Sequence, residues 1–161
     1  MRYLKGEEKE KAEYFLKKAE EAANKAKCLK SSRGVVIVKE GRVIGEGWNG
    51  PLEEICNKCL REDIKDDSRT ELCRGMHAEQ RAIINALKES HSLEGSTIYL
   101  IRLKNGIQKP EKGPSCSHCS KMMLETGVKE FVEVEKEGIA LYTAEEFYKL
   151  SMEYFTKKKG Q

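Results

Sequence analysis

The chain has 161 residues, of which 39% are hydrophobic, 35% are charged and six are cysteine. A chain of this length can bury about 70% of its unfolded surface, so we expect one domain over residues 1–161 whose core needs no disulfides. Thirty lysines and arginines against 27 aspartates and glutamates leave a net charge of +3. This balance argues against a protein that coats nucleic acid. It is compatible with the binding of a small anionic ligand.

The sequence also favours one cellular compartment. Residues 1–11 are charged and lack the apolar stretch of a signal peptide, and no later window approaches the roughly 20 apolar residues of a membrane helix. We therefore expect a cytoplasmic protein without membrane contact. In a reducing compartment, closely spaced cysteines indicate metal binding or catalysis before disulfides.

The first half of the chain predicts a helix and a hairpin before a long irregular segment. Apolar residues recur every three or four positions over residues 7–27, which is typical of an amphipathic helix. Two apolar runs, 35–38 and 42–48, flank Glu40-Gly41 and predict a β-hairpin. Residues 49–76 show no periodicity, and unstructured segments of that length in a compact domain are often functional.

The second half of the chain predicts helices that alternate with strands. The expected order is helix 77–89, strand 97–103, polar loop 104–114, helix 116–126, strand 128–134 and a final helix over about 143–158. Thr143 and Glu146 fit a capping box at the start of that last helix. With crossover helices between strands, the order predicts a three-layer α/β domain.

Two short motifs carry the chemistry. His77-Ala78-Glu79 begins one predicted helix, and Cys116-Ser117-His118-Cys119 begins the next, with one strand between them. Both helices should start at the same edge of the sheet, where ligands bind in open α/β folds. A helix N-terminus favours thiolates. One histidine and two cysteines leave the fourth position of a tetrahedral zinc ion for water, which is typical of a catalytic site.

Glu79 has a separate predicted role. It lies two residues after His77, about 200° round the helix, so it need not share the ligand face. Zinc lowers the pKa of a bound water toward roughly 7. A carboxylate beside that water can take its proton and pass it to a leaving amine.

These motifs resemble the zinc-dependent cytidine and deoxycytidylate deaminases, which share an H-x-E and P-C-x-x-C signature. Over about residues 12–134 the chain looks like the deoxycytidylate branch, through Val35–Val38, Gly45–Pro51, Cys59–Arg61 and Glu71–Gln80. The resemblance implies an α/β/α sandwich with a mixed sheet of about five strands, assembly into homo-oligomers, and a nucleotide substrate. The implied reaction is hydrolytic removal of the 4-amino group of a cytosine nucleotide, foremost dCMP to dUMP and ammonia.

Several residues match the family's functional positions. By this resemblance His77, Cys116 and Cys119 are zinc ligands and Glu79 is the proton shuttle. Asn49 matches an asparagine that contacts the sugar.

Two positions depart from the family pattern. Ser115, whose backbone region contacts the exocyclic amine in the family, replaces the usual proline before the first cysteine, and Arg81 stands where asparagine is common. Neither change removes a zinc ligand or the proton shuttle, so the predicted reaction class is unaffected. The two changes bear on which substrate the chain uses.

Four cysteines remain: Cys28, Cys56, Cys59 and Cys73. Cys56-x-x-Cys59 has metal-knuckle spacing, and some members of the resembling branch carry a second, structural zinc in this insertion. We expect the four thiolates to form such a site and to brace residues 49–76. The alternative is four free or buried thiols, since buried cysteine packs as a small hydrophobe.

Other interpretations stay open. One alternative is a zinc ribbon formed by Cys56-x-x-Cys59 together with Cys116-x-x-Cys119. A ribbon places roughly 15 to 20 residues between its two cysteine pairs, and these two pairs lie much further apart in the sequence. The chemistry could also serve a base in RNA or single-stranded DNA, or another amino-heterocycle. A zinc-stabilised binding protein without catalysis is the third possibility. Candidates for binding a phosphate are Arg33, Arg61 and Arg74.

Overall fold

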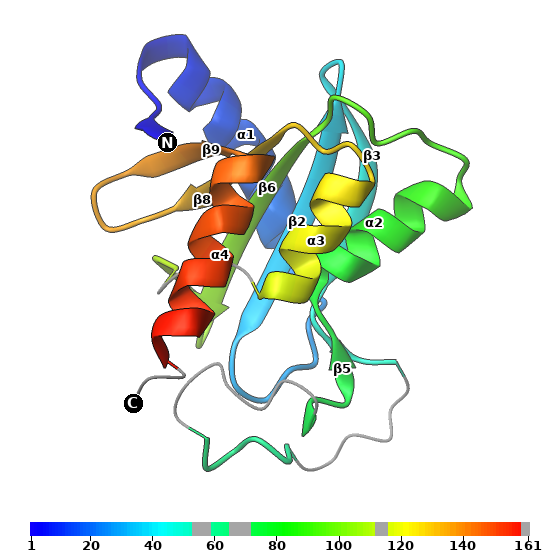
Figure 1. Ribbon diagram of the computed structural model, residues 1–161, viewed down its shortest axis with the longest axis vertical. Helices are drawn as coiled ribbons and strands as arrows, with labels where there is room; N and C mark the ends of the chain where they lie inside the picture. The colour runs from blue at the N-terminus through cyan, green and yellow to red at the C-terminus, as the bar shows by residue number, and fades with distance from the viewer. Residues whose placement is uncertain (53–58, 65–71, 112–115, 159–161) are drawn as a thin grey trace.

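The computed structural model describes residues 1–52, 59–64, 72–111 and 116–158 (Figure 1). Its helices are α1 (Gly6–Ala23), α2 (Ala78–Lys88), α3 (Ser117–Glu125) and α4 (Ala144–Lys158). The strands of the main sheet are β1 (Arg2–Tyr3), β2 (Ser32–Lys39), β3 (Arg42–Trp48), β6 (Thr97–Lys104), β7 (Ile107–Lys109), β8 (Glu130–Val134) and β9 (Ile139–Thr143). Two short strands, β4 (Gly50–Pro51) and β5 (Gly75–Met76), form a separate ribbon.

The sheet is mixed, as expected. Its strand order is β1-β9-β8-β6-β2-β3, with β7 paired to β6. Only β6 and β8 run parallel, with α3 in the connection between them, and the other pairs are antiparallel. The five longer strands match the predicted number; β1 is a short addition at one edge, and β7 is a short strand paired with the end of the interior strand β6.

Helices cover both faces of this sheet (Figure 1). Helix α1 packs on one face, where Phe15, Leu16 and Ala19 join Val36 and Ile101 in one buried cluster. Helices α2, α3 and α4 pack on the other, around a second cluster that includes Ile83, Met123, Phe131 and Phe147. The α/β/α sandwich is therefore confirmed.

The predicted hairpin is confirmed, and its turn has a clear cause. Glu40 and Gly41 both have positive φ, 50° and 77°, as a two-residue turn matching the twist of its strands requires. Gly34 on β2 is needed for packing, since a Cβ there would lie 1.9 Å from the Ala19 carbonyl oxygen of α1. The first helix ends at Ala23, earlier than predicted, because the chain turns at Asn24.

Strands β7 and β9 are among the elements that the sequence did not predict. The predicted loop 104–114 contains a second hairpin, in which Asn105 and Gly106 at φ 55° and 72° join β6 to β7. Residues 139–143 form β9, which pairs with β8. Both strands are three to five residues long, too short to show a period, so pairing with a neighbour decides them.

Close packing of α2 on β3 sets the position of the first motif. A Cβ at Gly47 would lie 2.2 Å from the Ala78 carbonyl oxygen, so only glycine allows the first turn of α2 to lie directly on the strand. Helix α3 begins beside it, as Figure 1 shows. Both helix N-termini thus lie at one end of the sheet, as predicted.

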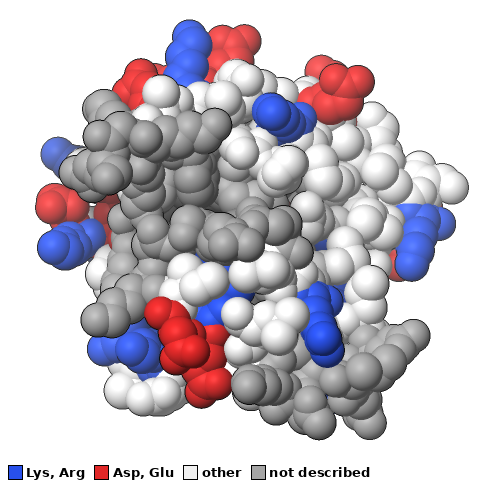
Figure 2. Space-filling view, turned by 60° about the horizontal axis from the view of Figure 1, so that its bottom comes forward, with Lys and Arg blue, Asp and Glu red and all other residues white. Residues whose placement is uncertain are grey.

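The surface carries charge of both signs. On the face shown in Figure 2, lysines and arginines lie among acidic and uncharged side chains, without a continuous field of one sign over the described residues. None of the described helices is long and apolar enough to cross a membrane.

Candidate active site

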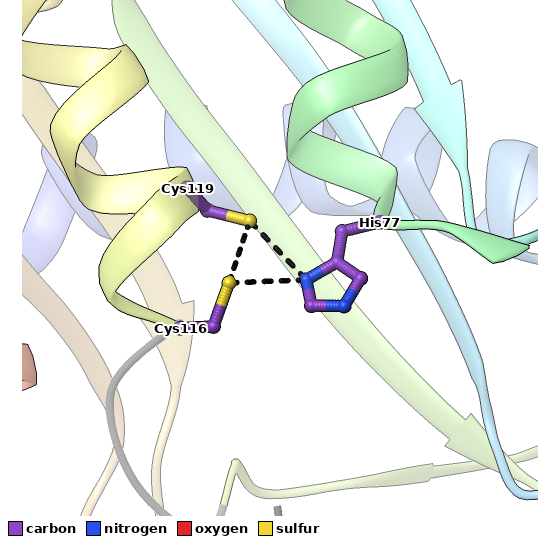
Figure 3. Close-up of side chains that lie close together, drawn as sticks. All are labelled: His77, Cys116 and Cys119. Atoms are coloured by element: carbon purple, nitrogen blue, oxygen red, sulfur yellow. Dashed lines mark hydrogen bonds between the residues drawn. The ribbon is translucent and has the colours of Figure 1, made fainter. Parts of the chain in front are cut away.

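Three side chains from two helix N-termini form a tight triangle (Figure 3). His77 Nδ1, Cys116 Sγ and Cys119 Sγ lie 3.2 Å from one another in each pair. His77 is the N-cap of α2, Cys116 is the N-cap of α3, and Cys119 lies in the first turn of α3. Within the described residues this is the one group of three or more potential ligands close enough to hold a metal ion.

The donor set fits zinc. Zn–S bonds of about 2.3 Å and Zn–N bonds of about 2.0 Å place tetrahedral ligand atoms roughly 3.5–3.8 Å apart. The observed 3.2 Å separations are a few tenths of an ångström shorter, so small side-chain shifts suffice. One imidazole and two thiolates are borderline-soft ligands that suit this ion.

One thiol of the triangle is ionised. The Cys119 thiol donates a hydrogen bond to the Cys116 thiolate, which together with His77 lowers the pKa of Cys116 to about 4. The same hydrogen bond and burial raise the pKa of Cys119, and the bond to Cys116 raises that of His77. At neutral pH Cys116 is therefore an anion at a helix N-terminus, which attracts a cation.

Glu79 lies beside this triangle and outside it. Its side chain is buried, at 3% exposure, and its negative charge raises the pKa of both His77 and Cys119. The carboxylate is thus within electrostatic reach of the triangle, although the ligand group does not include it. A buried carboxylate at this position can accept and release a proton.

Comparison with known proteins decides the family. A sequence model of the cytidine and deoxycytidylate deaminase zinc-binding region matches residues 9–135. The chain belongs to this family. It is 32% identical over 123 residues to the deoxycytidylate deaminase of Saccharomyces cerevisiae, covering 74% of this chain and 36% of that protein. It is 31% identical over 129 residues to the deoxycytidylate deaminase of Mycobacterium phage D29, covering 74% and 91% of the two chains.

A solved structure supports the same family assignment. The chain matches the crystal structure of dCMP deaminase from the cyanophage S-TIM5 in complex with dCMP and dUMP, with a TM-score of 0.54 and 29% identity over 76% of this chain and 79% of that one. The chain spans only 36% of the yeast relative's length but 91% of the D29 relative's.

Asn49, which the resemblance predicts to contact the sugar, is held by two hydrogen bonds to the backbone. Its Oδ1 accepts a hydrogen bond from the Arg33 backbone N–H at 2.7 Å, and its Nδ2 donates to the Ser31 carbonyl at 2.9 Å. One N–H and one lone pair of the amide remain for other partners. Ser115 lies outside the described residues.

Arg81 has a structural explanation. Its Nη2 donates to the carbonyl oxygens of Gly50 and Pro51 at 3.2 and 3.3 Å, and its guanidinium lies 5.0 Å from the ring centroid of Trp48. The Nζ of Lys25 lies 5.1 Å from the same ring. Arg81 therefore ties α2 to β4, directly after Asn49, where asparagine is too short to make both contacts.

Three of the remaining four cysteines lie among the residues that the structure describes. Cys28, Cys59 and Cys73 are half-buried free thiols, and Cys56 lies outside the described residues. The three described thiols do not by themselves form a ligand group. The backbones near two of them meet at β4, since a Cβ at Gly50 would lie 3.5 Å from the Cys28 nitrogen, and Gly75, two residues after Cys73, pairs with Pro51.

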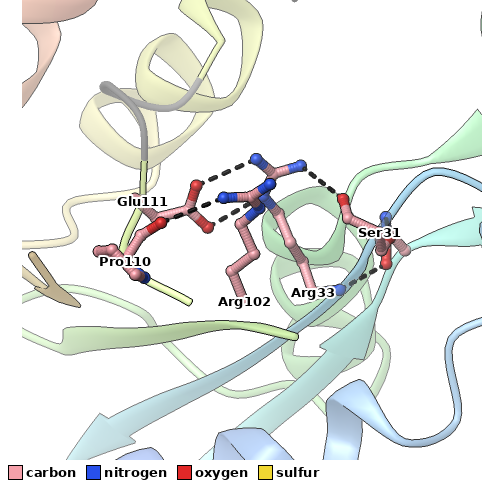
Figure 4. A network of polar contacts seen from close by, with 6 residues as sticks. Ser31, Arg33, Arg102, Pro110 and Glu111 are labelled. Carbon is pink, nitrogen blue, oxygen red and sulfur yellow. Dashed lines mark hydrogen bonds and ion pairs between the residues drawn. The ribbon is translucent and has the colours of Figure 1, made fainter. Parts of the chain in front are cut away.

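An ion pair near the triangle is absent from the sequence-based candidates. Glu111 accepts hydrogen bonds from Arg33 Nε and Nη2, both at 3.0 Å (Figure 4). The partners are 78 residues apart, so no local pattern could join them. Of the other two phosphate candidates, Arg61 is buried and its carbonyl accepts from Lys30, while Arg74 is exposed.

Proposed function

We propose that this chain is a zinc-dependent hydrolase that deaminates a cytosine nucleotide, with dCMP converted to dUMP and ammonia. The observation that carries the proposal is the triangle of His77, Cys116 and Cys119 with buried Glu79 beside it. The names of the relatives support the substrate, and the cyanophage S-TIM5 enzyme was crystallised with dCMP and dUMP.

In this proposal His77, Cys116 and Cys119 hold the ion. Zinc, when bound there, lowers the pKa of water and so supplies a nucleophile at neutral pH. Glu79 takes a proton from the water that attacks C4 of the base and delivers it to N3. It then transfers the second proton of that water to the departing amine. The C4–N bond breaks, ammonia leaves, and the water oxygen becomes the C4 carbonyl oxygen.

Substrate contacts follow the family pattern in this proposal. Asn49 uses its remaining amide N–H or lone pair on the sugar, and the backbone near Ser115 receives the exocyclic amine. The two backbone hydrogen bonds that fix the Asn49 amide support this role, since an oriented polar group binds without further ordering.

We also propose that Cys28, Cys56, Cys59 and Cys73 form a closed structural zinc site. The meeting of the backbones near Cys28 and Cys73 at β4 supports it. Such a site would brace the segment before His77. Homo-oligomer formation and a cytoplasmic location stay predictions from the sequence.

The decisive experiment combines zinc quantification with an ammonia-release assay on cytosine, cytidine, CMP, dCMP, dCTP and a cytosine-containing oligonucleotide. We expect two zinc ions per chain and the highest kcat/KM for dCMP. Faster turnover of the oligonucleotide would favour the polymer-directed alternative. Zinc binding without ammonia release from any compound would favour a binding protein, and one zinc per chain would remove the structural site.

A further inference from the structure

A pocket lies beneath α4 at the carboxyl ends of β6 and β8. Its volume is about 850 Å³, and its lining includes Arg102, Glu111, Glu133, Tyr142 and Lys104. Small-molecule sites usually enclose about 300–1,000 Å³, so the pocket is large enough for part of a nucleotide. The carboxyl ends of strands are also where ligands bind in open α/β sheets.

This pocket adjoins the triangle. Arg33 lies within electrostatic reach of His77 and Cys119 on one side and of Glu133, a pocket residue, on the other. The Arg33 partner Glu111 lines the pocket and precedes Cys116 by only five positions. The Arg33–Glu111 pair therefore lies at the edge of the pocket and within electrostatic reach of the triangle.

Two arginines lie side by side at this border (Figure 4). Arg33 on β2 and Arg102 on β6 are direct partners in the antiparallel register, so their side chains share the face that carries α2, α3 and α4. Like charges directly opposite each other destabilise a sheet. Glu111 neutralises Arg33 through two hydrogen bonds.

Arg102 has no such compensation. Its Nη1 donates to the Pro110 carbonyl at 3.1 Å, whereas its Nε is buried and has no hydrogen-bond partner. Among the residues that the structure describes, it forms no ion pair with a carboxylate. An uncompensated buried donor costs free energy, which a bound anion would recover.

Two carboxyl groups of the pocket lining are either neutral or hydrogen-bonded to tyrosines. Glu133 is 4% exposed, and burial raises its pKa well above the usual range, which favours its neutral form. Glu135 accepts hydrogen bonds from Tyr3 and Tyr142. At the exposed rim, Lys104, Lys109 and Lys136 outnumber Glu137 and Glu153.

We propose that Arg102 binds the 5′-phosphate of the substrate and so selects a nucleotide over a nucleoside. The inference rests on the proposed function. Its geometry follows from the chain: the Asn49 amide is bonded to the backbone of Arg33, and Arg102 is the cross-strand partner of Arg33, a separation of about 4.5–5.5 Å between Cα atoms. A phosphate one step beyond the sugar would reach a guanidinium, which binds phosphate through two N–H groups.

The test compares dCMP with deoxycytidine, which lacks only the phosphate. For Arg102→Gln we expect kcat/KM for dCMP to fall about 30- to 100-fold, the effect of losing charge-assisted hydrogen bonds, while the value for deoxycytidine stays unchanged. Arg102→Lys keeps a charge without the planar fork, so the dCMP to deoxycytidine ratio should fall about tenfold. Arg2→Gln, which removes an exposed arginine paired with Glu8, is the matched control and leaves both values unchanged.

The outcomes separate this inference from the proposed function. A wild-type chain that does not deaminate dCMP overturns both. Wild-type activity with an unchanged ratio in Arg102→Gln overturns the inference alone, as does an equal loss on both substrates, which would mark a structural role. If Arg102→Gln does not fold, as judged by zinc content and circular dichroism, an unchanged ratio in Arg102→Lys overturns the inference.

Discussion

The two faces of the central sheet differ in chemistry. The face under α1 is apolar along its length, with Phe15, Tyr99 and Val132 in one continuous cluster. The opposite face is apolar around Phe131 and Phe147 but polar at one end, where Glu79, Arg33, Glu111 and Glu133 gather.

This difference has a physical cause. Helix α1 needs only to bury one stripe against the sheet, whereas α2 and α3 present their N-termini at the sheet's end and leave N–H groups and positive dipole ends there. Polar side chains collect where those ends can stabilise them. Stability and chemistry should therefore be separable by face.

The largest expected effect is on the polar face. Replacing Glu79 with alanine should lower kcat/KM for dCMP by about 10³-fold or more, since it removes the proton carrier. Zinc content and the unfolding midpoint should stay near the wild-type values. Glu145→Ala, an exposed glutamate of α4, serves as control. Full activity in Glu79→Ala would refute the proposed proton transfers.

The apolar face should respond in the opposite way. Phe15 is 4% exposed and packs against Tyr99 with ring centroids 5.1 Å apart. Phe15→Ala should destabilise the fold by about 3–5 kcal/mol, measured by urea unfolding, with kcat unchanged per folded molecule. Tyr14→Ala, at a site 60% exposed, should cost under about 1 kcal/mol. A selective loss of kcat in Phe15→Ala would contradict the division between faces.

The Arg33–Glu111 pair tests whether the polar end also contributes stability. Glu111→Gln keeps the shape and removes the charge from a side chain that is 6% exposed, so it should cost about 2 kcal/mol in the free energy of unfolding. A double-mutant cycle with Arg33→Gln should show coupling of at least about 1 kcal/mol. Additive effects of the two changes would mean that the pair contributes nothing.

The smallest effect is expected at Arg81. Replacing it with asparagine, the family's common residue, removes two hydrogen bonds and the contact with Trp48, and should cost about 1 kcal/mol. Because β4 follows Asn49, KM for dCMP should rise a few-fold with kcat little changed. Arg81→Lys should recover part of the loss. A large fall in kcat with unchanged KM would assign Arg81 a different role.

Local patterns predicted much of the fold. The hairpin at Glu40-Gly41 and the capping box at Thr143 depend on neighbouring residues, and both are present, the latter with reciprocal hydrogen bonds between Thr143 and Glu146. Strands β1, β7 and β9 were not predicted, because segments of two to five residues are strands only through their partners.

The residues of the site show the same contrast between local and long-range signals. The sequence was enough to identify His77, Glu79, Cys116 and Cys119 as candidates. Short motifs show both where the two helices begin, at one edge of the sheet, and which side chains can bind a metal ion or carry a proton. The roles of Arg81 and Glu111 could not be identified in this way, since their partners lie 30 or more residues away.

By itself, the sequence determined the family and the identity of three candidate ligands and predicted the reaction class, because short-range spacing and residue chemistry encode them. Only the tertiary structure decided that Arg33 is neutralised by Glu111 while its cross-strand partner Arg102 is not. Charge balance depends on distances between side chains on neighbouring strands, and the order of residues in the sequence does not specify these distances.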